Sequence, residues 1–295
     1  MLRRLGLKVM LAVLVLSPAA VTPGQTADTR PAALTQPKVE YEVYAIRYAT
    51  LVGYPVSQLV VGAEASRKMD LAMMVWLVRG EGHNILVDSG FFRDKFFHDD
   101  RFHIIDFVKP SDALSPLGLR AEDVTDLIIT HMHWDHADGI DLFPKTRIWI
   151  QKDEYNYYAG EAWASKDTHQ GIDQDDVLSL VKLDLAGRVS LVPGDNQEIL
   201  PGVICYTGGR HTYASQYVSV TTAKGVVVLA SDNVYVEENL KKHAPISATL
   251  DRNSNLRAQD RMRQIASSER FIITGHDPAV FTEFPVVAPG VVKIE

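Results

Sequence analysis

The sequence predicts a layered domain of the α/β or α+β class. Two observations lead to this prediction: apolar runs of strand length recur along most of the chain, and segments with helical patterns lie between them. Hydrophobic residues make up 46% of the 295 residues, which is too high a share for a disordered chain. At this length a single sandwich and a pair of domains are both compatible with the pattern.

The N-terminus has the three-part pattern of a secretory signal peptide. A basic start that includes Arg3 and Arg4 precedes the apolar run Val9–Leu16, and small, turn-forming residues follow. The apolar run is too short to span a bilayer, which takes about 20 residues. We therefore expect a signal peptide over residues 1–27 and a polar linker over 28–37. The mature protein is expected in the periplasm or outside the cell, without a stable membrane anchor.

Strands are expected where β-branched and aromatic residues cluster between turn-forming residues. These runs are Val39–Arg47, Leu71–Arg79, Asn84–Val87, Asp126–Thr130, Arg147–Gln151, Val189–Val192, Val203–Thr207, Gln216–Thr222, Val226–Ser231 and Phe271–Thr274. Glycines at 80 and 82 indicate a hairpin between the second and third runs. Helical patterns fit Asp153–Tyr158, Asp175–Leu180 and Leu256–Ser267.

The segment Phe91–Leu119 is rich in phenylalanine, charge and proline and has no clean period. Long irregular segments of this kind often act as lids or binding loops. We expect its aromatic rings to line an apolar channel for an acyl chain, with ordinary core filling beneath the loop as the alternative. The rings are those of Phe91, Phe92, Phe96, Phe97, Phe102 and Phe107.

Charge and cysteine content exclude several functions. The formal net charge is −7 and no cluster of lysine and arginine is present, which argues against a nucleic-acid partner. Cys205 is the single cysteine, so neither an intrachain disulfide nor a cysteine-rich zinc module can form. We expect Cys205 to be a small buried strand residue.

One motif dominates the chemistry of the sequence. His131, His133, Asp135 and His136 follow directly after the apolar run Leu127–Thr130. Neutral imidazoles and carboxylates are the ligand types that zinc and similar metals prefer. Because four such residues lie within six positions, we expect a tight loop here, turned with the help of Asp138 and Gly139.

Three further polar residues follow strand-like runs. His211, Asp232 and His276 each come shortly after such a run, and active-site residues commonly gather at strand ends. With the first motif they make five histidines and two aspartates, enough for two metal ions. The other histidines lack this context: His83, His98, His103, His169 and His243. Of these, His103 is the one most expected near the site, because it lies in the segment Phe91–Leu119, which is the candidate lid.

In its order and spacing this set resembles the signature of the metallo-β-lactamase superfamily. The resemblance covers the mature chain from Asp88 to the last ligand and implies an α+β fold: a four-layer αβ/βα sandwich in one domain over residues 38–295. It also implies two Zn²⁺ or other divalent ions and a structural role for Asp88. By the family pattern His131, His133 and His211 would bind one ion, Asp135, His136 and His276 the other, and Asp232 would bridge them.

Within the superfamily the chain most resembles the N-acyl homoserine lactonases. The lactamases of class B1 place a cysteine where Asp232 stands, and Tyr235 resembles the substrate-facing tyrosine of the lactonases. We therefore expect a small-molecule lactone or ester substrate, attacked by a hydroxide held between the two ions. Tyr235 would donate a hydrogen bond to the carbonyl oxygen, and Asp135 would relay a proton to the leaving alkoxide.

Other reactions remain compatible with the same ligands. They are cleavage of a thioester, a β-lactam or a phosphodiester, or oxygen chemistry on a single iron as in persulfide dioxygenases. A binding protein without activity is a further alternative, against which the complete ligand set argues. No G-x-S-x-G motif is present to supply a serine nucleophile.

Overall fold

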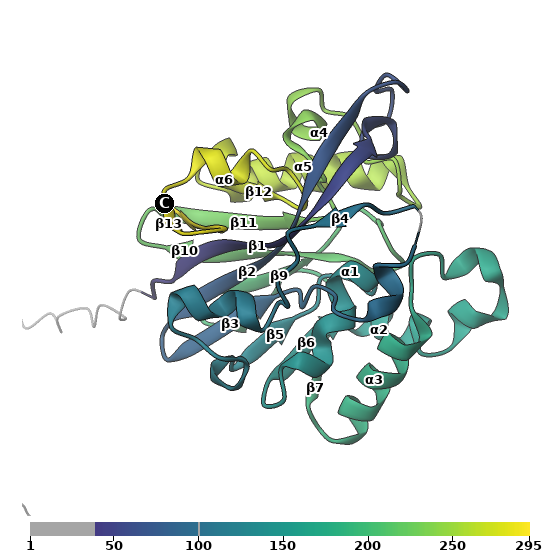
Figure 1. Ribbon diagram of the computed structural model, residues 1–295. Helices are drawn as coiled ribbons and strands as arrows, with labels where there is room; N and C mark the ends of the chain where they lie inside the picture. The colour runs from purple at the N-terminus through teal and green to yellow at the C-terminus, as the bar shows by residue number, and fades with distance from the viewer. Residues whose placement is uncertain (1–38, 100) are drawn as a thin grey trace, which may run out of the picture. The chain divides into compact units, whose positions relative to one another are not determined.

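Two β-sheets packed face to face form the centre of the computed structural model (Figure 1). The structure describes residues 39–99 and 101–295, and Val39–Glu295 forms one compact unit. The expected signal peptide, 1–27, and linker, 28–37, lie outside the described residues. Within the described part, no helix is both long and apolar enough to cross a membrane.

The larger sheet has nine strands and mixes antiparallel with parallel pairs. Its antiparallel part is built on the long hairpin of β1 and β2, and its parallel part runs from β3 through β5 and β6 to β7. The order is β13 (Val286–Ala288), β14 (Val291–Ile294), β1 (Glu42–Pro55), β2 (Lys68–Gly80), β3 (His83–Val87), β5 (Asp126–Ile128), β6 (Arg147–Gln151) and β7 (Val189–Val192), with β4 (Ile104–Ile105) paired to β1.

The smaller sheet has five strands. Its pairs are antiparallel except for β11 and β12, which run parallel, so that the segments following these two strands leave the sheet at the same edge. The order is β12 (Ile272–Thr274), β11 (Gly225–Ser231), β10 (Gln216–Thr222), β9 (Val203–Thr207) and β8 (Gln197–Leu200).

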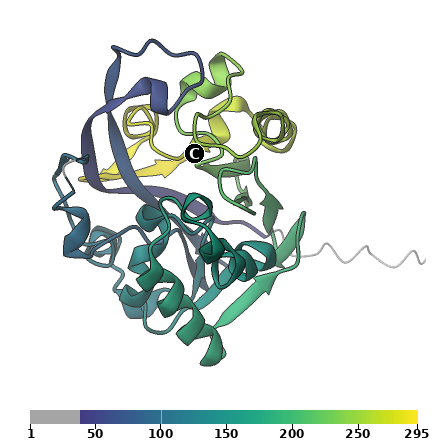
Figure 2. The same cartoon turned by 90° about the vertical axis from the view of Figure 1, so that its right-hand side faces the viewer.

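Helices cover the outer faces of both sheets (Figures 1 and 2). Asp173 and Asp251 cap the two longest, α3 and α5, by accepting hydrogen bonds from backbone N–H groups of the first turn. The helices are α1 (Trp134–Ala137), α2 (Lys152–Tyr158), α3 (Gln174–Leu185), α4 (Glu237–Lys241), α5 (Arg252–Ile265) and α6 (Val280–Glu283). Short 3₁₀ segments lie at Val56–Gln58, Asp94–Phe96, Asp112–Leu117, Ala121–Asp123, Asp138–Leu142, Glu161–Ala164, Lys166–Thr168 and Glu269–Phe271.

Three apolar clusters separate these layers. A central cluster lies between the sheets and includes Trp76 and Cys205. A second cluster joins the larger sheet to the side of α1, α2 and α3, and a third joins the smaller sheet to α5 through residues such as Met262. Helix, sheet, sheet and helix therefore follow one another, which confirms the predicted four-layer αβ/βα sandwich.

The structure contains the expected elements together with several that were not expected. Most bounds agree within a few residues, but β1, expected at Val39–Arg47, extends to Pro55, and α3, expected to end at Leu180, extends to Leu185. The strands β4, β8, β13 and β14 were not expected, because each is short and lies at an edge of a sheet or at the end of the chain. The short helices α1, α4 and α6 were not expected either. The expectation of a tight loop at His131–Gly139 was wrong: residues Trp134–Ala137 form the helical turn α1, and a 3₁₀ turn follows it.

Candidate metal centre

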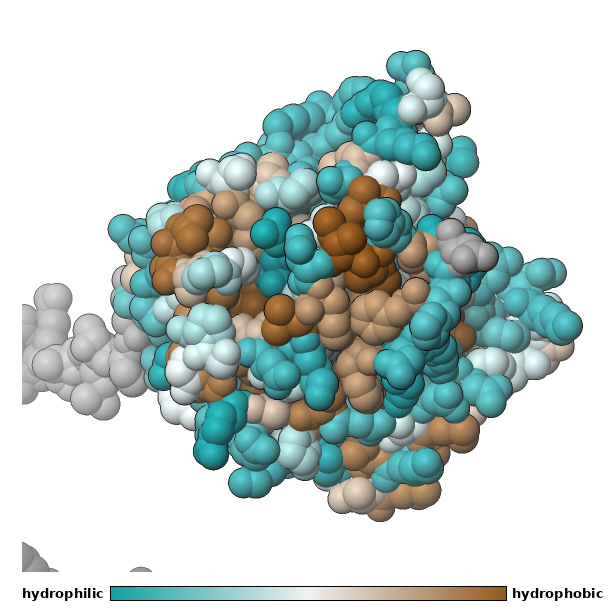
Figure 3. Space-filling view, in the orientation of Figure 1, coloured by the Kyte–Doolittle hydropathy of each residue, from teal (hydrophilic) through white to brown (hydrophobic). Residues whose placement is uncertain are grey.

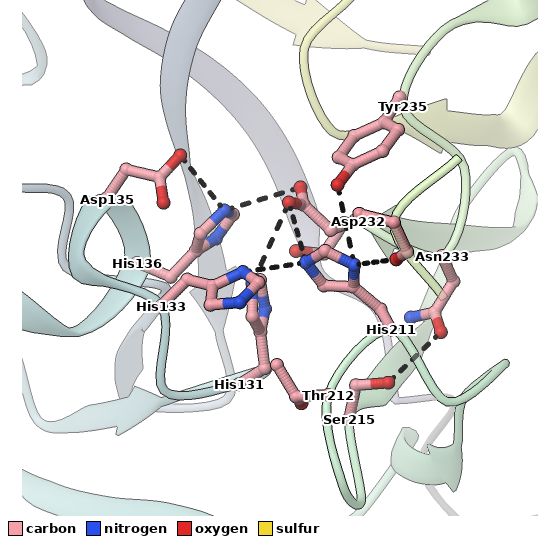
Figure 4. Close-up of polar contacts among 12 residues, drawn as sticks. His131, His133, Asp135, His136, His211, Thr212, Ser215, Asp232, Asn233 and Tyr235 are labelled. Atoms are coloured by element: carbon pink, nitrogen blue, oxygen red, sulfur yellow. Dashed lines mark hydrogen bonds and ion pairs between the residues drawn. The ribbon is translucent and has the colours of Figure 1, made fainter. Parts of the chain in front are cut away.

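The seven expected ligands meet at the ends of several strands. Figure 4 labels all of them except His276. The residues from 131 to 136 follow β5, and His211 follows β9. Asp232 and His276 follow the parallel neighbours β11 and β12. The strand ends predicted to carry the site are therefore brought together as expected, from four separate parts of the chain.

A first group of ligand atoms surrounds one oxygen of Asp232. Nε2 of His211 lies 3.2 Å from Oδ2 of Asp232, and Nε2 of His131 lies 3.7 Å from the same oxygen. Nδ1 of His133 lies 2.8 Å from Nε2 of His211 and 3.1 Å from Nε2 of His131. The ligand atoms of these four residues all lie within 4.8 Å of one another, and they could hold one metal ion.

A second group surrounds the other oxygen of the same carboxylate. Nε2 of His276 lies 3.0 Å and Nε2 of His136 lies 3.3 Å from Oδ1 of Asp232. Oδ2 of Asp135 lies 3.7 Å and 3.6 Å from these two nitrogens. Asp135, His136 and His276 form a second cluster of ligand size. Asp232 faces both clusters, one oxygen to each, which is the placement of a bridging ligand.

The donor set fits divalent metal ions. Nε2 of His136 and Oδ1 of Asp232 are buried and have no hydrogen-bond partner, although buried polar atoms are nearly always paired. Five imidazoles and two carboxylates match the ligand preference of zinc and similar metals. A cation at each cluster would satisfy these atoms.

The electrostatics of the two groups differ. Burial lowers the pKa of His131 and His133 well below the usual value, and neighbouring imidazoles lower it further, so both rings are neutral. Burial alone would lower the pKa of His136. The carboxylates of Asp232, Asp135 and Asp88 outweigh this effect and raise the pKa of His136 well above its usual value. The second group therefore carries excess negative charge that a cation would balance.

Backbone and side-chain acceptors orient the rings from outside. Nδ1 of His211 lies 2.7 Å from the carbonyl oxygen of Ala248, and Nδ1 of His276 lies 3.2 Å from that of Ala72. With the outer nitrogen donating, the inner nitrogen presents its lone pair to the site. Such outer contacts set the tautomer and the direction of histidine ligands.

A buried network holds His136 in place. Oδ2 of Asp88 lies 2.7 Å from Nδ1 of His136 and also accepts hydrogen bonds from the hydroxyls of Thr130 and Ser231. Its Oδ1 accepts from the backbone N–H of Thr130 at 2.8 Å. Asp88 thus has the structural role that the family resemblance implied.

Two glycines permit the close packing of the ligand segments. A Cβ at Gly139 would lie 2.1 Å from the carbonyl oxygen of Ser89, so Gly139 allows the two backbone segments to approach closely. The sequence had suggested a different role for Gly139, in turning a loop. A Cβ at Gly275 would lie 2.7 Å from Oδ1 of Asp232. Real Cβ atoms do not approach other heavy atoms this closely, so neither position accepts a side chain without movement.

A cleft of about 310 Å³ opens onto the ligands. One wall of the cleft is apolar, and the rest of its lining is mixed. Tyr235 and Asp135 both line the cleft, as expected for residues that face a substrate. The hydroxyl of Tyr235 lies 3.4 Å from Nδ1 of His211 (Figure 4). Burial and the nearby carboxylates raise the pKa of Tyr235 well above its usual value, so it stays protonated and can donate.

The expected phenylalanine channel is mostly absent from this cleft. Of the six rings only Phe102 lines it, next to Trp134. Phe91 is fully buried, and it packs against Phe96, Phe97 and other aromatic rings beneath the segment. The alternative of core filling therefore holds for most of the segment. Figure 3 shows an apolar patch in the region of β4, where Ile105 is 40% exposed.

The remaining residues considered from the sequence lie apart from the metal centre. His103 is exposed and does not line the cleft, so the expectation that it would approach the site was wrong. Cys205 is buried in the central core, as expected, and burial raises the pKa of its thiol to about 12. His83 contacts Asp126, and His243 contacts Asp260.

Two residues of the site were not found from the sequence. Thr130 bonds both Asp88 and Nδ1 of His131, and its position directly before the motif was the one available signal. Glu154 lies in α2 and contacts the two segments that carry His131, His133 and His211. Nothing in the pattern around Glu154 distinguishes it from an exposed helical acid, so only the fold shows its place.

Comparisons with known proteins agree with this geometry. A family profile described as the Metallo-beta-lactamase superfamily matches residues 72–276. An N-acyl homoserine lactonase of Bacillus cereus is 27% identical over 223 residues, which cover 71% of this chain and 82% of the relative. N-acyl homoserine lactonase AiiB of Agrobacterium fabrum is 24% identical over 235 residues, covering 74% of this chain and 83% of AiiB.

Solved structures show the same fold. The crystal structure of a quorum-quenching N-acyl homoserine lactone lactonase matches with a TM-score of 0.69 at 22% identity, over 86% of this chain and 99% of that one. AidC, a dizinc quorum-quenching lactonase in complex with a product, matches with a TM-score of 0.64 at 17% identity, over 86% and 94%.

Proposed function

This chain belongs to the metallo-beta-lactamase superfamily, and we propose that it is an exported hydrolase that uses two divalent metal ions to open a lactone ring. The observation that carries the proposal is the division of the ligand atoms between the two oxygens of Asp232. A carboxylate that faces two clusters can hold two ions close together, and two-metal hydrolases use separations of roughly 3.5–4 Å. Zinc is the metal that suits this histidine-rich set.

Each ligand has a proposed place. The first ion would be held by His131, His133 and His211 and the second by Asp135, His136 and His276, with Asp232 shared between them. Bound divalent ions would supply a hydroxide nucleophile at neutral pH and positive charge for the carbonyl and alkoxide oxygens.

Tyr235 would act as a hydrogen-bond donor in the reaction, and Asp135 would transfer a proton. The hydroxyl of Tyr235 is protonated at neutral pH, because burial raises its pKa, and it faces the ligands from the wall of the cleft. It can donate a hydrogen bond to the substrate carbonyl oxygen as that oxygen gains negative charge. Asp135 combines a place among the ligands with contact to the cleft, so its carboxylate can accept the proton that the attacking water gives up and pass it to the leaving alkoxide.

The substrate class rests on the cleft and on the relatives. Leu51, Leu71 and Met73 give the cleft an apolar wall beside the ligands, which suits a substrate with an apolar acyl part. The relatives of Bacillus cereus and Agrobacterium fabrum are named N-acyl homoserine lactonases. A small-molecule lactone of this kind, or a similar ester, is therefore the proposed substrate.

The test is a hydrolysis screen with metal analysis. The purified mature chain is assayed by pH-stat against lactones, thioesters, β-lactams and phosphodiesters, and its metal content is measured in parallel. We expect two zinc ions per chain and cleavage of lactones, abolished in His133→Ala and retained in the control His103→Ala, whose side chain is exposed and outside the cleft. One iron per chain with oxygen uptake on a persulfide would overturn hydrolysis. Cleavage of another panel member with lactones untouched would overturn the lactonase proposal alone.

Export is a separate part of the proposal. It rests on the basic start and the apolar run Val9–Leu16 in the sequence. Mass spectrometry of the protein from fractionated cells tests it, and the expected result is a chain in the periplasm or medium that starts between Ala19 and Ala27. A full-length chain confined to the cytoplasm would contradict export without affecting the proposed reaction.

A further inference from the structure

Glu154, in α2, is a buried carboxylate that contacts two of the ligand segments. Its side chain is fully buried. Its Oε1 accepts hydrogen bonds from the backbone N–H of Met132, at 3.1 Å, and from the hydroxyl of Thr212, at 2.6 Å. Its Oε2 accepts from the backbone N–H of Ala214, at 2.7 Å.

The carboxylate of Glu154 is satisfied by hydrogen bonds from neutral groups. No lysine or arginine forms an ion pair with it in the part of the chain that the structure describes, and all three of its donors are neutral. Burying a carboxylate without a cation is costly, and breaking its hydrogen bonds would leave a buried charge unsatisfied. The three donors are therefore held to this carboxylate more firmly than ordinary surface contacts would hold them.

The contacts of Glu154 fall on one metal group alone. Met132 lies between His131 and His133, and Thr212 follows His211 directly. A single oxygen thus joins the two segments that carry all three histidines of the first group. Among the described contacts of Glu154, none is to Asp135, His136 or His276, which form the second group.

We propose that Glu154 is a positioning residue that sets the spacing between the His131–His133 segment and His211, and so controls the affinity of the first metal ion selectively. This inference rests on the proposed two-ion centre. Glu154 touches no ligand atom directly and acts through the backbone of Met132 and the side chain of Thr212. Outer contacts of this kind typically change metal affinity by about 10–100-fold.

Glu154→Gln is the informative variant, because it keeps the size of the side chain and replaces one acceptor by a donor. With either orientation of the amide, its NH₂ group would face a backbone N–H, of Met132 or of Ala214. Two donors cannot bond each other, so in one orientation the His131–His133 segment, and in the other the segment after His211, loses its backbone hydrogen bond to residue 154. Thr212→Val is a milder second variant, since it removes one of the three donors and leaves the carboxylate in place.

The experiment measures Zn²⁺ affinity by competition with a chromophoric chelator, on the full mature chain stripped of metal. For the wild type we expect two ions, and for Glu154→Gln one of them weakened by about 10–100-fold and the other little changed. Thr212→Val should weaken the same ion by a smaller factor. The matched control is Asp126→Asn, another buried acid, bonded to His83 and Trp149 far from the ligands in the fold, and it should change neither ion.

Two backgrounds identify which ion is affected. With His276→Ala, which damages the second group, Glu154→Gln should still weaken the remaining ion by about 10–100-fold. With His211→Ala, which damages the first group, it should have little further effect, because the interaction it supports is already lost. The thermal unfolding of the metal-free proteins shows separately whether each variant folds. If Glu154→Gln does not fold, Thr212→Val in the two backgrounds decides the question by the same criterion.

The outcomes separate this inference from the proposed function. A wild type that binds fewer than two ions overturns the two-ion centre and this inference with it. A wild type that binds two ions, with Glu154→Gln weakening both equally or neither, overturns the positioning role alone. If Glu154→Gln weakens both ions equally or neither, Glu154 only links α2 to the segments around Met132 and Thr212.

Discussion

Nε2 of His276 lies 3.0 Å from Oδ1 of Asp232, and the two residues follow the parallel neighbouring strands β12 and β11. The distance depends on Gly275, where a Cβ would lie 2.7 Å from that same oxygen and 2.8 Å from the carbonyl oxygen of Ser231. A residue without a side chain is therefore required for His276 to reach the bridging carboxylate.

Gly275→Ala should damage the second metal group. The added methyl group would press against Oδ1 of Asp232 and the carbonyl group of Ser231. Overpacking of this kind costs about 1–3 kcal/mol. We expect a lower thermal unfolding temperature of the metal-free protein and the loss of one of two zinc ions. Metal analysis and calorimetry measure both. Gly187→Ala is the control for adding a methyl group where nothing lies within 4 Å, although its positive φ makes a small loss of stability expected there too. Retention of both ions in Gly275→Ala would contradict the argument.

Tyr235→Phe should lower kcat and leave metal content unchanged. The variant removes a donor aimed at the substrate oxygen, and the loss of one such donor typically costs about 10²–10³-fold in kcat. Its ring should pack as before, because only the hydroxyl is removed. Steady-state kinetics on the best lactone measure the effect. Tyr213→Phe serves as the control, since that ring is partly exposed and stacks on Tyr157 outside the cleft. Equal kinetics of Tyr235→Phe and the wild type would remove Tyr235 from the reaction.

Asp176 should make the protein less stable as the pH rises from about 4 to 8. Burial, together with Asp138 and Asp173, raises its pKa to about 8, and its Oδ2 is buried without a partner. Because the folded state holds this proton more tightly than the unfolded chain, the stabilisation is complete below the unfolded pKa near 4. It is lost as the pH approaches 8.

Asp176→Asn should flatten this part of the profile. The variant is expected to gain about 1–3 kcal/mol relative to the wild type between pH 5 and pH 8, the usual cost of an unsatisfied buried group. Urea unfolding at both pH values measures it, with a chelator present so that metal loss does not contribute. Asp175→Asn, at the exposed neighbouring position, is the control and should lose stability between pH 5 and pH 8 as the wild type does. Parallel profiles for the wild type and Asp176→Asn would contradict the prediction.

Cys205 should be unreactive in the folded protein. Burial in the central core raises the pKa of its thiol to about 12, and the thiolate is the reactive form. A disulfide reagent at pH 8 should therefore label it only as fast as the chain unfolds. The labelling rate is compared in buffer and in denaturant, and rapid labelling in buffer would show an open path to the core. The raised pKa also means that any stability from this thiol is lost only as the pH rises from about 9 towards 12.

The ligands of the centre could be predicted from the sequence because each follows an apolar strand. A strand end is a place where the backbone leaves the sheet, and the side chains beyond it are free to face a common edge. His211, Asp232 and His276 were identified by this signal although each is an ordinary residue type. Edge strands such as β8 and β13 are only 4 and 3 residues long, and they were missed for that reason.

The aromatic segment shows the limit of the same reasoning. Its composition predicted a channel, but a ring in a core and a ring in a cleft satisfy the same apolar pattern. Phe91 packs inside and Phe102 lines the cleft. Only the tertiary structure separates the two, because it packs Phe91 against Phe96 and Phe97 and places Phe102 in the wall of the cleft.

Apolar periodicity predicted a layered domain, and the resemblance of the histidine and aspartate motif to a known family predicted the four-layer sandwich and seven candidate ligands, because periodicity and residue type are local properties of the chain. Tertiary structure alone decided how the two oxygens of Asp232 divide those ligands, and that Glu154 joins two of their segments. It also decided which residues surround the cleft. The physical reason is that distances between residues far apart in the chain arise from how the two sheets and their helices pack, and no local pattern records them.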